Sequence, residues 1–401
     1  MAEGGGFSAE GRARLVAGLQ GYVDRGEVPG AVVLAHRHGE EAVCRIVGAA
    51  DDEGLTPLAR NSVFRIGSMT KPIVSVAALT LVEEGRLRLS DRVGQWLPEL
   101  AAPKVLASPT AKIADAAPAP RPITVEDLLT HRAGFATALV AQGELGQAVQ
   151  PLSGGLGRRS EMEPDAWMAM LGDLPLASPP GVEVINGFAT DVLGVLLARL
   201  TGQSLPELLA ERVLDPLGMT DTGFWVPPET LGRLVPAYTV QWLSGKRRVV
   251  DHPGDSLWAR PPLFPSGSGG LVSTADDYLR FGLMLLNNGA LEGRRVLSRK
   301  SVELMTTDFL TPEQRAIPFF GYPYWSDRGL GLGVYVLDNL ARHGALGSPG
   351  QYGWAGAFAT AWFNDPAERM TAVMMAQVSF PAVIPPVRAD FETLVYQAID
   401  D

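Results

Sequence analysis

The chain has 401 residues and carries 44 Asp and Glu against 34 Lys and Arg, a formal net charge of −10. This balance argues against nucleic acid as a partner. The composition is 46% hydrophobic and 19% charged, as in ordinary globular proteins.

The N-terminal stretch MAEGGGFSAEGRARL lacks a signal-peptide core, and no run reaches the roughly 18 apolar residues of a membrane span. We therefore expect a cytoplasmic protein that does not contact a membrane. Cys44 is the single cysteine, which excludes an internal disulfide.

Two short apolar runs, PGAVVLAH and AVCRIVGA, lie near the N-terminus and flank the polar segment AHRHGEE. Apolar runs on both sides of a short polar segment predict an antiparallel hairpin whose turn holds His36 and His38. A metal-ligand role for these histidines is less favoured, because no second cluster with ligand spacing follows. We therefore expect neither a metal nor a cofactor.

The segment SVFRIGSMTKPIVSVAALTLVEEGRLRLSD places Ser68 three residues before Lys71, where an apolar helix begins. Apolar residues recur at helical spacing after this pair, at Val74, Ala77, Ala78 and Leu81. Gly85 is a natural helix stop. Residues three apart share a helix face, so the amine can reach the hydroxyl and activate it if burial lowers the amine pKa. The alternative is a capping serine and a solvated lysine, and S-x-x-K by itself does not decide between them.

Helical patterns alternate with loops rich in Pro, Gly and Ala over residues 93–263. The loop AAPKVLASPTAKIADAAPAPRP is either a disordered linker or an ordered surface excursion, and its mixed apolar content favours the second. We interpret residues 93–263 as a helical insertion domain. Residues 1–92 and 264–401 then form an α/β domain with an antiparallel sheet.

Three strands are predicted near the C-terminus, in GLGLGVYVLD, AGAFATAWF and RMTAVMMAQV. The last two are joined by NDPAE, which has the composition of a turn. Residues 387–399 show helical periodicity. We expect strands from both chain ends to share one sheet, with helices packed on it.

The segment FRIGSMTKP…LVEEGRLRLSDRV resembles the serine β-lactamase and penicillin-binding-protein superfamily, especially class C β-lactamases and family VIII carboxylesterases. Four later segments are similar to that superfamily in the expected order: ITVEDLLTHRAGF, TDVLGVLLARLTGQSLPELLAERVLDPLGMTDTGFWV, PSGSGGLVSTADDYLRFGLMLLNNG and GQYGWAGAFATAWFNDP. The resemblance covers residues 10 to 400. It implies an α+β, β-lactamase-like fold with an antiparallel sheet flanked by helices, a mostly helical domain, and an active site between them.

By position, the resemblance implies that Ser68 is the acylated nucleophile and Lys71 its base. It places the third motif of the family, which contacts substrate, at Trp354, Ala355 and Gly356. The backbone amides of Ser68 and Ala357 would form the oxyanion hole, and a glycine beside them permits close backbone approach. A core aromatic is the alternative for the tryptophan.

The second motif departs from the family pattern, because PPGVEVINGFATDVLG places Asn186 where a tyrosine belongs. Asn has no titratable proton and cannot act as a base. Three explanations stay open: an enzyme in which Lys71 alone is the base, an engineered or trapped variant, or a silenced relative used for binding. Tyr238 is a candidate substitute base, although a tyrosine in that context is more often structural.

A serine hydrolase acting on small-molecule carboxylic esters is the favoured function, since WAG lacks the lysine that helps bind a β-lactam carboxylate. No G-x-S-x-G surrounds a serine, which argues against an α/β-hydrolase. The alternatives are an acyltransferase using the same acyl-enzyme, a β-lactamase or amidase, and a non-catalytic binding protein. Acyl and alcohol specificity and the oligomeric state stay open.

Overall fold

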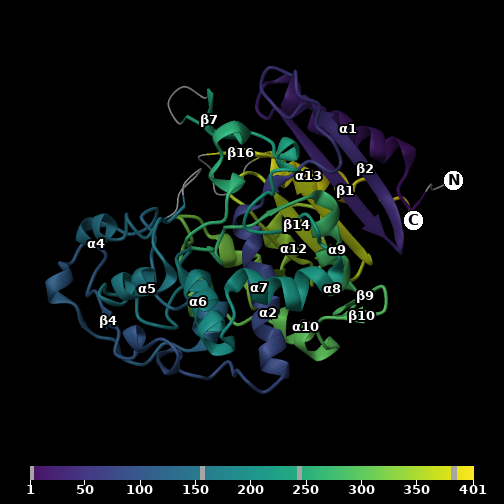
Figure 1. Cartoon of the computed structure of the whole chain (residues 1–401). Coiled ribbons are helices and arrows are strands. Elements are labelled where there is room, and N and C mark those ends of the chain that lie inside the picture. The colour runs from purple at the N-terminus through teal and green to yellow at the C-terminus, as the bar shows by residue number, and fades with distance from the viewer. Residues whose placement is uncertain (1–3, 154–158, 242–245, 381–385) are drawn as a thin grey trace.

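The computed structural model describes residues 4–153, 159–241, 246–380 and 386–401 (Figure 1). A seven-stranded antiparallel sheet forms one side of the molecule. Its strands, in spatial order, are β11 (Arg328–Leu330), β12 (Tyr335–Leu337), β13 (Tyr352–Ala355), β14 (Ala361–Asp365), β15 (Met370–Met375), β1 (Gly30–Arg37) and β2 (Glu40–Gly48). Val32 of β1 faces Met375 of β15. This pairing confirms that strands from both chain ends share one sheet.

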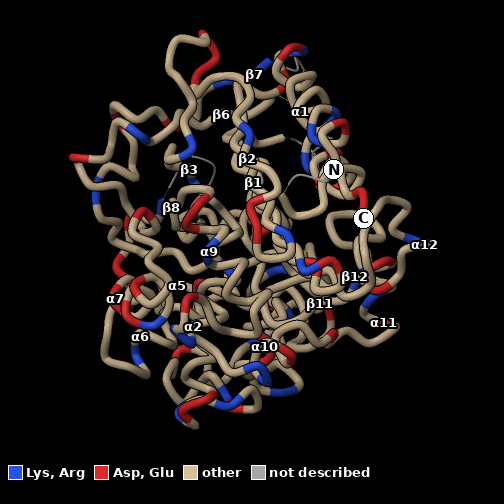
Figure 2. The backbone as a smooth tube through the Cα atoms, turned by 90° about the vertical axis from the view of Figure 1, so that its right-hand side faces the viewer, with Lys and Arg blue, Asp and Glu red and all other residues tan. Residues whose placement is uncertain are grey.

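The first and last described residues of the chain lie close together (Figure 2). The Ser8 amide donates to the Ala398 carbonyl at 2.9 Å, and the Asp400 amide donates to the Gly6 carbonyl at 3.0 Å. These backbone hydrogen bonds connect the residues just before the first helix to those just after the last one. In the same view, basic and acidic residues are interspersed along the backbone.

The predicted N-terminal hairpin is confirmed by the antiparallel pairing of β1 with β2. His38 and Gly39 form its two-residue turn, with φ angles of 55° and 88°. Two successive positive φ angles match the twist of the flanking strands and are favoured in tight hairpins. His36 lies near the end of β1 and not in the turn.

The C-terminal strand predictions place the strands in the right region but miss two turns. GLGLGVYVLD is not one strand, because the chain turns at Gly333 (φ 82°) between β11 and β12. That glycine lies so close to α2 (Thr70–Glu83) that an added Cβ would stand 2.2 Å from the Ser75 hydroxyl oxygen. AGAFATAWF likewise contains the turn between β13 and β14, where Ala359 has a φ of 57°. The NDPAE turn and the final helix, α13 (Pro386–Tyr396), are present as expected.

The two faces of the sheet bury different cores because side chains alternate along each strand. In β1, Val32 and Leu34 join the core shared with the helical layer. Ala31 and Val33 join a second core under α1 (Ala9–Asp24) and α13. Helix α9 (Ala275–Leu286) packs on β14, β15 and β1 from the first side. The sheet is therefore covered by helices on both faces (Figure 1).

The middle of the chain combines short helices with long loops, and its α4 (Gly143–Ala148) and α5 (Pro164–Gly172) lie on the far side of α2 from the sheet (Figure 1). Its other helices are α3 (Val125–Leu129), α6 (Ala189–Thr201), α7 (Leu205–Leu209) and α8 (Asp215–Leu217). The later helices are α10 (Arg299–Met305), α11 (Pro312–Arg315) and α12 (Leu340–His343). Almost every residue of α2 is buried, since the helix stands between the two parts. Within the ranges that the structure describes, no helix is both long and apolar enough to cross a membrane.

Short strands complete the fold. They are β3 (Phe64–Arg65) with β8 (Val272–Ser273), β4 (Lys104–Val105) with β5 (Ala117–Pro118), β9 (Ala290–Leu291) with β10 (Arg294–Arg295), and β6 (Ala237–Val240) with both β7 (Arg247–Asp251) and β16 (Val378–Ser379). The β4–β5 pair shows that the proline-rich loop is an ordered excursion. Strand β6, from the middle of the chain, pairs with β16 from the C-terminal part. This pairing crosses the proposed domain boundary, so the boundaries at residues 92 and 263 stay a prediction.

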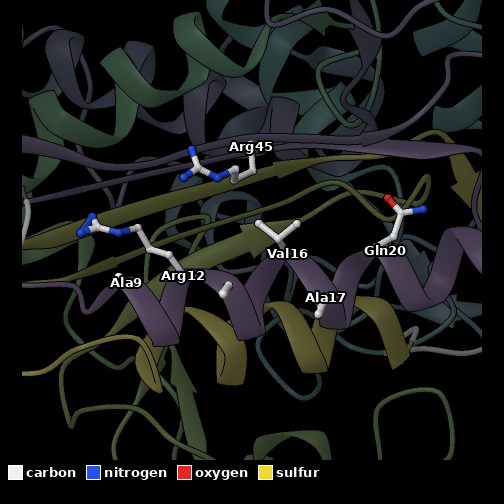
Figure 3. Close-up of a pocket in the computed structure, with 7 residues that line it drawn as sticks. Ala9, Arg12, Val16, Ala17, Gln20 and Arg45 are labelled. Atoms are coloured by element: carbon white, nitrogen blue, oxygen red, sulfur yellow. The ribbon is translucent and has the colours of Figure 1, made fainter.

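Two surface hollows lie outside the region of Ser68. One, of about 450 Å³, runs between α1 and β2, where Arg12 and Val16 from the helix and Arg45 from the strand line it (Figure 3). The other, of about 640 Å³, lies at the C-terminal end of α9 and includes His36 and Arg369. Neither contains a residue that the sequence assigns to the site.

Candidate active site

Ser68 and Lys71 lie together at the beginning of α2. Ser68 is part of a single 3₁₀ turn, Gly67–Met69, that leads directly into the helix. The Lys71 Nζ donates a hydrogen bond to the Ser68 Oγ at 2.9 Å. Among the described residues no side chain caps the helix start, and Lys71 is only 2% exposed. A capping serine beside a solvated lysine is therefore not what the sequence encodes here.

The environment of Lys71 favours the neutral amine. Burial lowers the pKa of Lys71 to about 8, and the nearby Asp191 carboxylate limits that shift. The amine also donates to the carbonyl oxygen of Ser268 at 2.7 Å. A lysine with a pKa near 8 is partly unprotonated at neutral pH, so it can accept a proton from the hydroxyl to which it is bonded.

A buried carboxylate organises the loop that contacts Lys71. Asp191, in the first turn of α6, accepts hydrogen bonds from the Ser266 hydroxyl (2.6 Å) and the Ser268 amide (3.0 Å). These bonds orient the Ser268 carbonyl toward the lysine. Burial raises the pKa of Asp191, which its hydrogen bonds and Lys71 oppose. The sequence interpretation missed this group, although an aspartate at a buried helix start and the nearby SGSGG loop were visible signals.

The turn between β13 and β14 packs against the turn that holds Ser68. An added Cβ on Gly67 (φ 51°) would stand 3.0 Å from the Ala357 amide nitrogen. An added Cβ on Gly356 would stand 2.2 Å from the carbonyl oxygen of Ile66. Only glycine at both places permits this approach. The approach places the Ala357 amide beside the Ser68 turn, where it can act as an oxyanion donor.

Trp354 lies at the end of β13 and is half-buried. Its ring centroid is 5.6 Å from that of His131, a residue without an assigned role in the sequence interpretation. It also packs against a small cluster that includes Trp325 and Tyr335. Trp354 is thus partly open and not a fully enclosed core aromatic. Ala355 and Gly356 follow it, also half-buried.

Asn186 and Tyr238 have no hydrogen bond to Ser68 or Lys71 in the described parts of the chain. Asn186 is half-buried in the loop before α6, directly after Ile185. Tyr238 lies in β6, and its hydroxyl accepts a hydrogen bond from the Asp52 amide at 3.1 Å. Burial raises the pKa of Tyr238 to about 12, so its phenolate is scarce at neutral pH. This geometry argues against Tyr238 as a substitute base.

Comparison with known proteins gives a consistent result. The family model named Beta-lactamase matches residues 15–397. An uncharacterized protein of Mycobacterium tuberculosis is 40% identical over 90% of this chain and 88% of its own length. Esterase EstB of Burkholderia gladioli is 29% identical over 96% of this chain and 95% of its own. The solved structure of EstCE1, a hydrolase with promiscuous acyltransferase activity, superimposes with a TM-score of 0.78 and 26% identity, covering 98% of this chain and 99% of that one.

The expected α+β, β-lactamase-like fold and the resemblance to esterases of that fold are both confirmed by these matches. The match spans nearly the whole chain, including the Ser68 turn, the Asn186 loop and the β13–β14 turn. The chain belongs to the β-lactamase family, and its relatives include esterases and acyltransferases of the serine hydrolase type.

Proposed function

We propose that this protein is a carboxylesterase-type serine hydrolase of the family VIII kind, which acts on small-molecule esters through an acyl-enzyme on Ser68. The observation that carries the proposal is the 2.9 Å hydrogen bond from the buried Lys71 amine to the Ser68 hydroxyl. A serine is a weak nucleophile unless a neighbouring base takes its proton. The pKa of Lys71, lowered to about 8, suits that task.

In the proposed mechanism, the Ser68 oxygen attacks the ester carbonyl carbon while Lys71 takes the hydroxyl proton. The backbone amides of Ser68 and Ala357 stabilise the negative oxygen of the tetrahedral intermediate. Lys71 then protonates the leaving alcohol, and water releases the acid from the acyl-enzyme. Trp354, Ala355 and Gly356 contact the substrate at the end of β13.

Acyl transfer to an alcohol or amine is the second candidate. It uses the same acyl-enzyme and differs only in the nucleophile that resolves it. EstCE1 is a hydrolase with promiscuous acyltransferase activity. This likeness supports acyl transfer as a second candidate activity of this protein. A β-lactamase or amidase activity is less favoured, because the third motif supplies no lysine for a substrate carboxylate.

Intact-protein mass spectrometry after exposure to p-nitrophenyl acetate tests the proposal. The wild type should gain one acetyl group, and Ser68→Ala should gain none. Ser108→Ala, which removes an exposed serine in the surface excursion, is the matched control and should acylate like the wild type. Acylation of Ser68→Ala at the wild-type rate would disprove the assignment of the nucleophile. A wild type that binds esters without any adduct would favour the non-catalytic alternative.

A further inference from the structure

His131 has an unusual backbone that the fold maintains from two sides. Its φ angle is 53°, in the left-handed region that a non-glycine residue seldom adopts. Its amide donates to the Leu128 carbonyl at 3.3 Å, and its own carbonyl accepts from the Ile185 amide at 2.9 Å. The second bond ties His131 to the residue directly before Asn186. Such backbone strain persists where the surroundings impose it, and it is common at functional sites.

The imidazole of His131 is enclosed but has an unused polar atom. His131 is only 4% exposed, and its ring centroid lies 5.6 Å from that of Trp354. The Nε2 atom is buried and has no hydrogen-bond partner among the described residues. Buried polar atoms in folded proteins are nearly always hydrogen-bonded, so a nitrogen of this kind calls for a partner such as a water or a bound molecule.

The charge of Lys71 acts on the His131 imidazole. Burial lowers the pKa of His131 to about 3, and the charge of Lys71 adds to the shift. The ring is therefore neutral at physiological pH and can hydrogen-bond without taking up a proton. A neutral lysine amine has two N–H donors and one lone pair. The acceptors found for Lys71 in the described chain, Ser68 and Ser268, engage both donors, and the lone pair can take a proton from water.

We propose that the His131 imidazole hydrogen-bonds the water that hydrolyses the acyl-enzyme and positions it beside Lys71. The inference rests on the proposed function and adds a residue to it. The water oxygen forms a bond to the acyl carbon while one water proton passes to the Lys71 amine. The bond from the acyl carbon to the Ser68 Oγ then breaks, Lys71 returns the proton to that oxygen, and the carboxylic acid leaves. His131 neither gains nor loses a proton in this sequence.

The proposed position explains how a site with Asn186 can complete turnover. Lys71 can take a proton from Ser68 without help, since the two are hydrogen-bonded. The second nucleophile, by contrast, is a free water and must be oriented before it can attack. His131 contacts both the Asn186 loop and Trp354, so its ring is placed to supply that orientation. We therefore expect a selective effect of His131 on deacylation.

Pre-steady-state kinetics of His131→Gly with p-nitrophenyl acetate tests this inference. Glycine accepts the left-handed backbone, so this change removes the side chain without straining the turn. The burst rate, which reports acylation, should stay within about twofold of the wild type, and the steady-state rate should fall about tenfold or more, the scale of one lost hydrogen bond. Added imidazole should restore the steady-state rate of His131→Gly after subtraction of the Ser68→Ala background, and should not accelerate the wild type.

Two further variants keep the test decisive. His131→Asn also tolerates the left-handed backbone but ends short of the Nε2 position, so it should show the same selective loss. Asn288→Gly, at an exposed left-handed position after α9, is the matched control and should change neither rate. Wild-type deacylation in His131→Gly, or an equal loss of both rates without imidazole rescue, would overturn the inference alone. Absence of any wild-type turnover and of any acyl adduct on Ser68 would overturn it together with the proposed function.

Discussion

Replacing Lys71 by methionine should reveal how far burial has shifted the proton equilibrium of the lysine. Burial lowers its pKa from 10.5 to about 8 in the folded protein. Between these values the unfolded chain binds more protons than the folded chain, so the free energy of unfolding rises with pH across that window. At about 1.4 kcal/mol per pKa unit, the wild type should gain roughly 2 kcal/mol over Lys71→Met between about pH 7 and pH 9.5. Methionine carries no titrating amine, and its length is similar.

Urea unfolding of both proteins at a series of pH values measures this gain. Lys104→Met removes an exposed lysine and is the matched control, for which the difference from the wild type should not change with pH. Esterase activity should rise through the same window with a midpoint near 8, because the neutral amine is the proposed base. A difference between the wild type and Lys71→Met that is constant from about pH 7 to pH 9.5 would refute the burial argument.

Three further variants test the surroundings of this pair. Gly356→Ala would bring a Cβ to 2.2 Å from the Ile66 carbonyl oxygen and push the two oxyanion donors apart. We therefore expect the burst rate, which measures acylation, to fall about 10²-fold. An unchanged burst rate would contradict the donor assignment. Asn186→Tyr should shorten the lifetime of the acyl-enzyme more than it speeds the burst, and slower rates in both phases would exclude this position as the family's tyrosine site. Tyr238→Phe should keep turnover within about twofold while losing about 1 kcal/mol of stability from the Asp52 amide bond, and a large loss of activity would restore Tyr238 as the base.

Local patterns in the sequence predicted much of the fold, because they depend on residues close together in the chain. The alternating runs around His38 and Gly39 predict the hairpin, and helical spacing after Lys71 predicts α2. The turn at Gly333 was missed, and the contact that requires a glycine there is with Ser75, a residue far away in the sequence. Such tertiary contacts leave no local signal.

The same distinction applies to the site. The spacing of Ser68 and Lys71 predicts their contact, and the structure places them within hydrogen-bonding distance. Spacing says nothing about burial, which decides whether the amine is a base or a solvated charge. Asp191 and His131 were missed as site residues for this reason, since each matters through contacts with distant parts of the chain.

The pairing of β1 with β15 also sets the order in which the protein can mature. Val32 pairs with Met375, so nearly the whole chain must be synthesised before β1 and β15 can pair. Closing so long a loop is entropically costly and slow compared with local pairing. The turn that packs beside Ser68 follows β13 and therefore also emerges late. A nascent chain therefore contains Ser68 long before the turn beside it is in place, and the proposed acylation requires the last strands of the sheet to have paired.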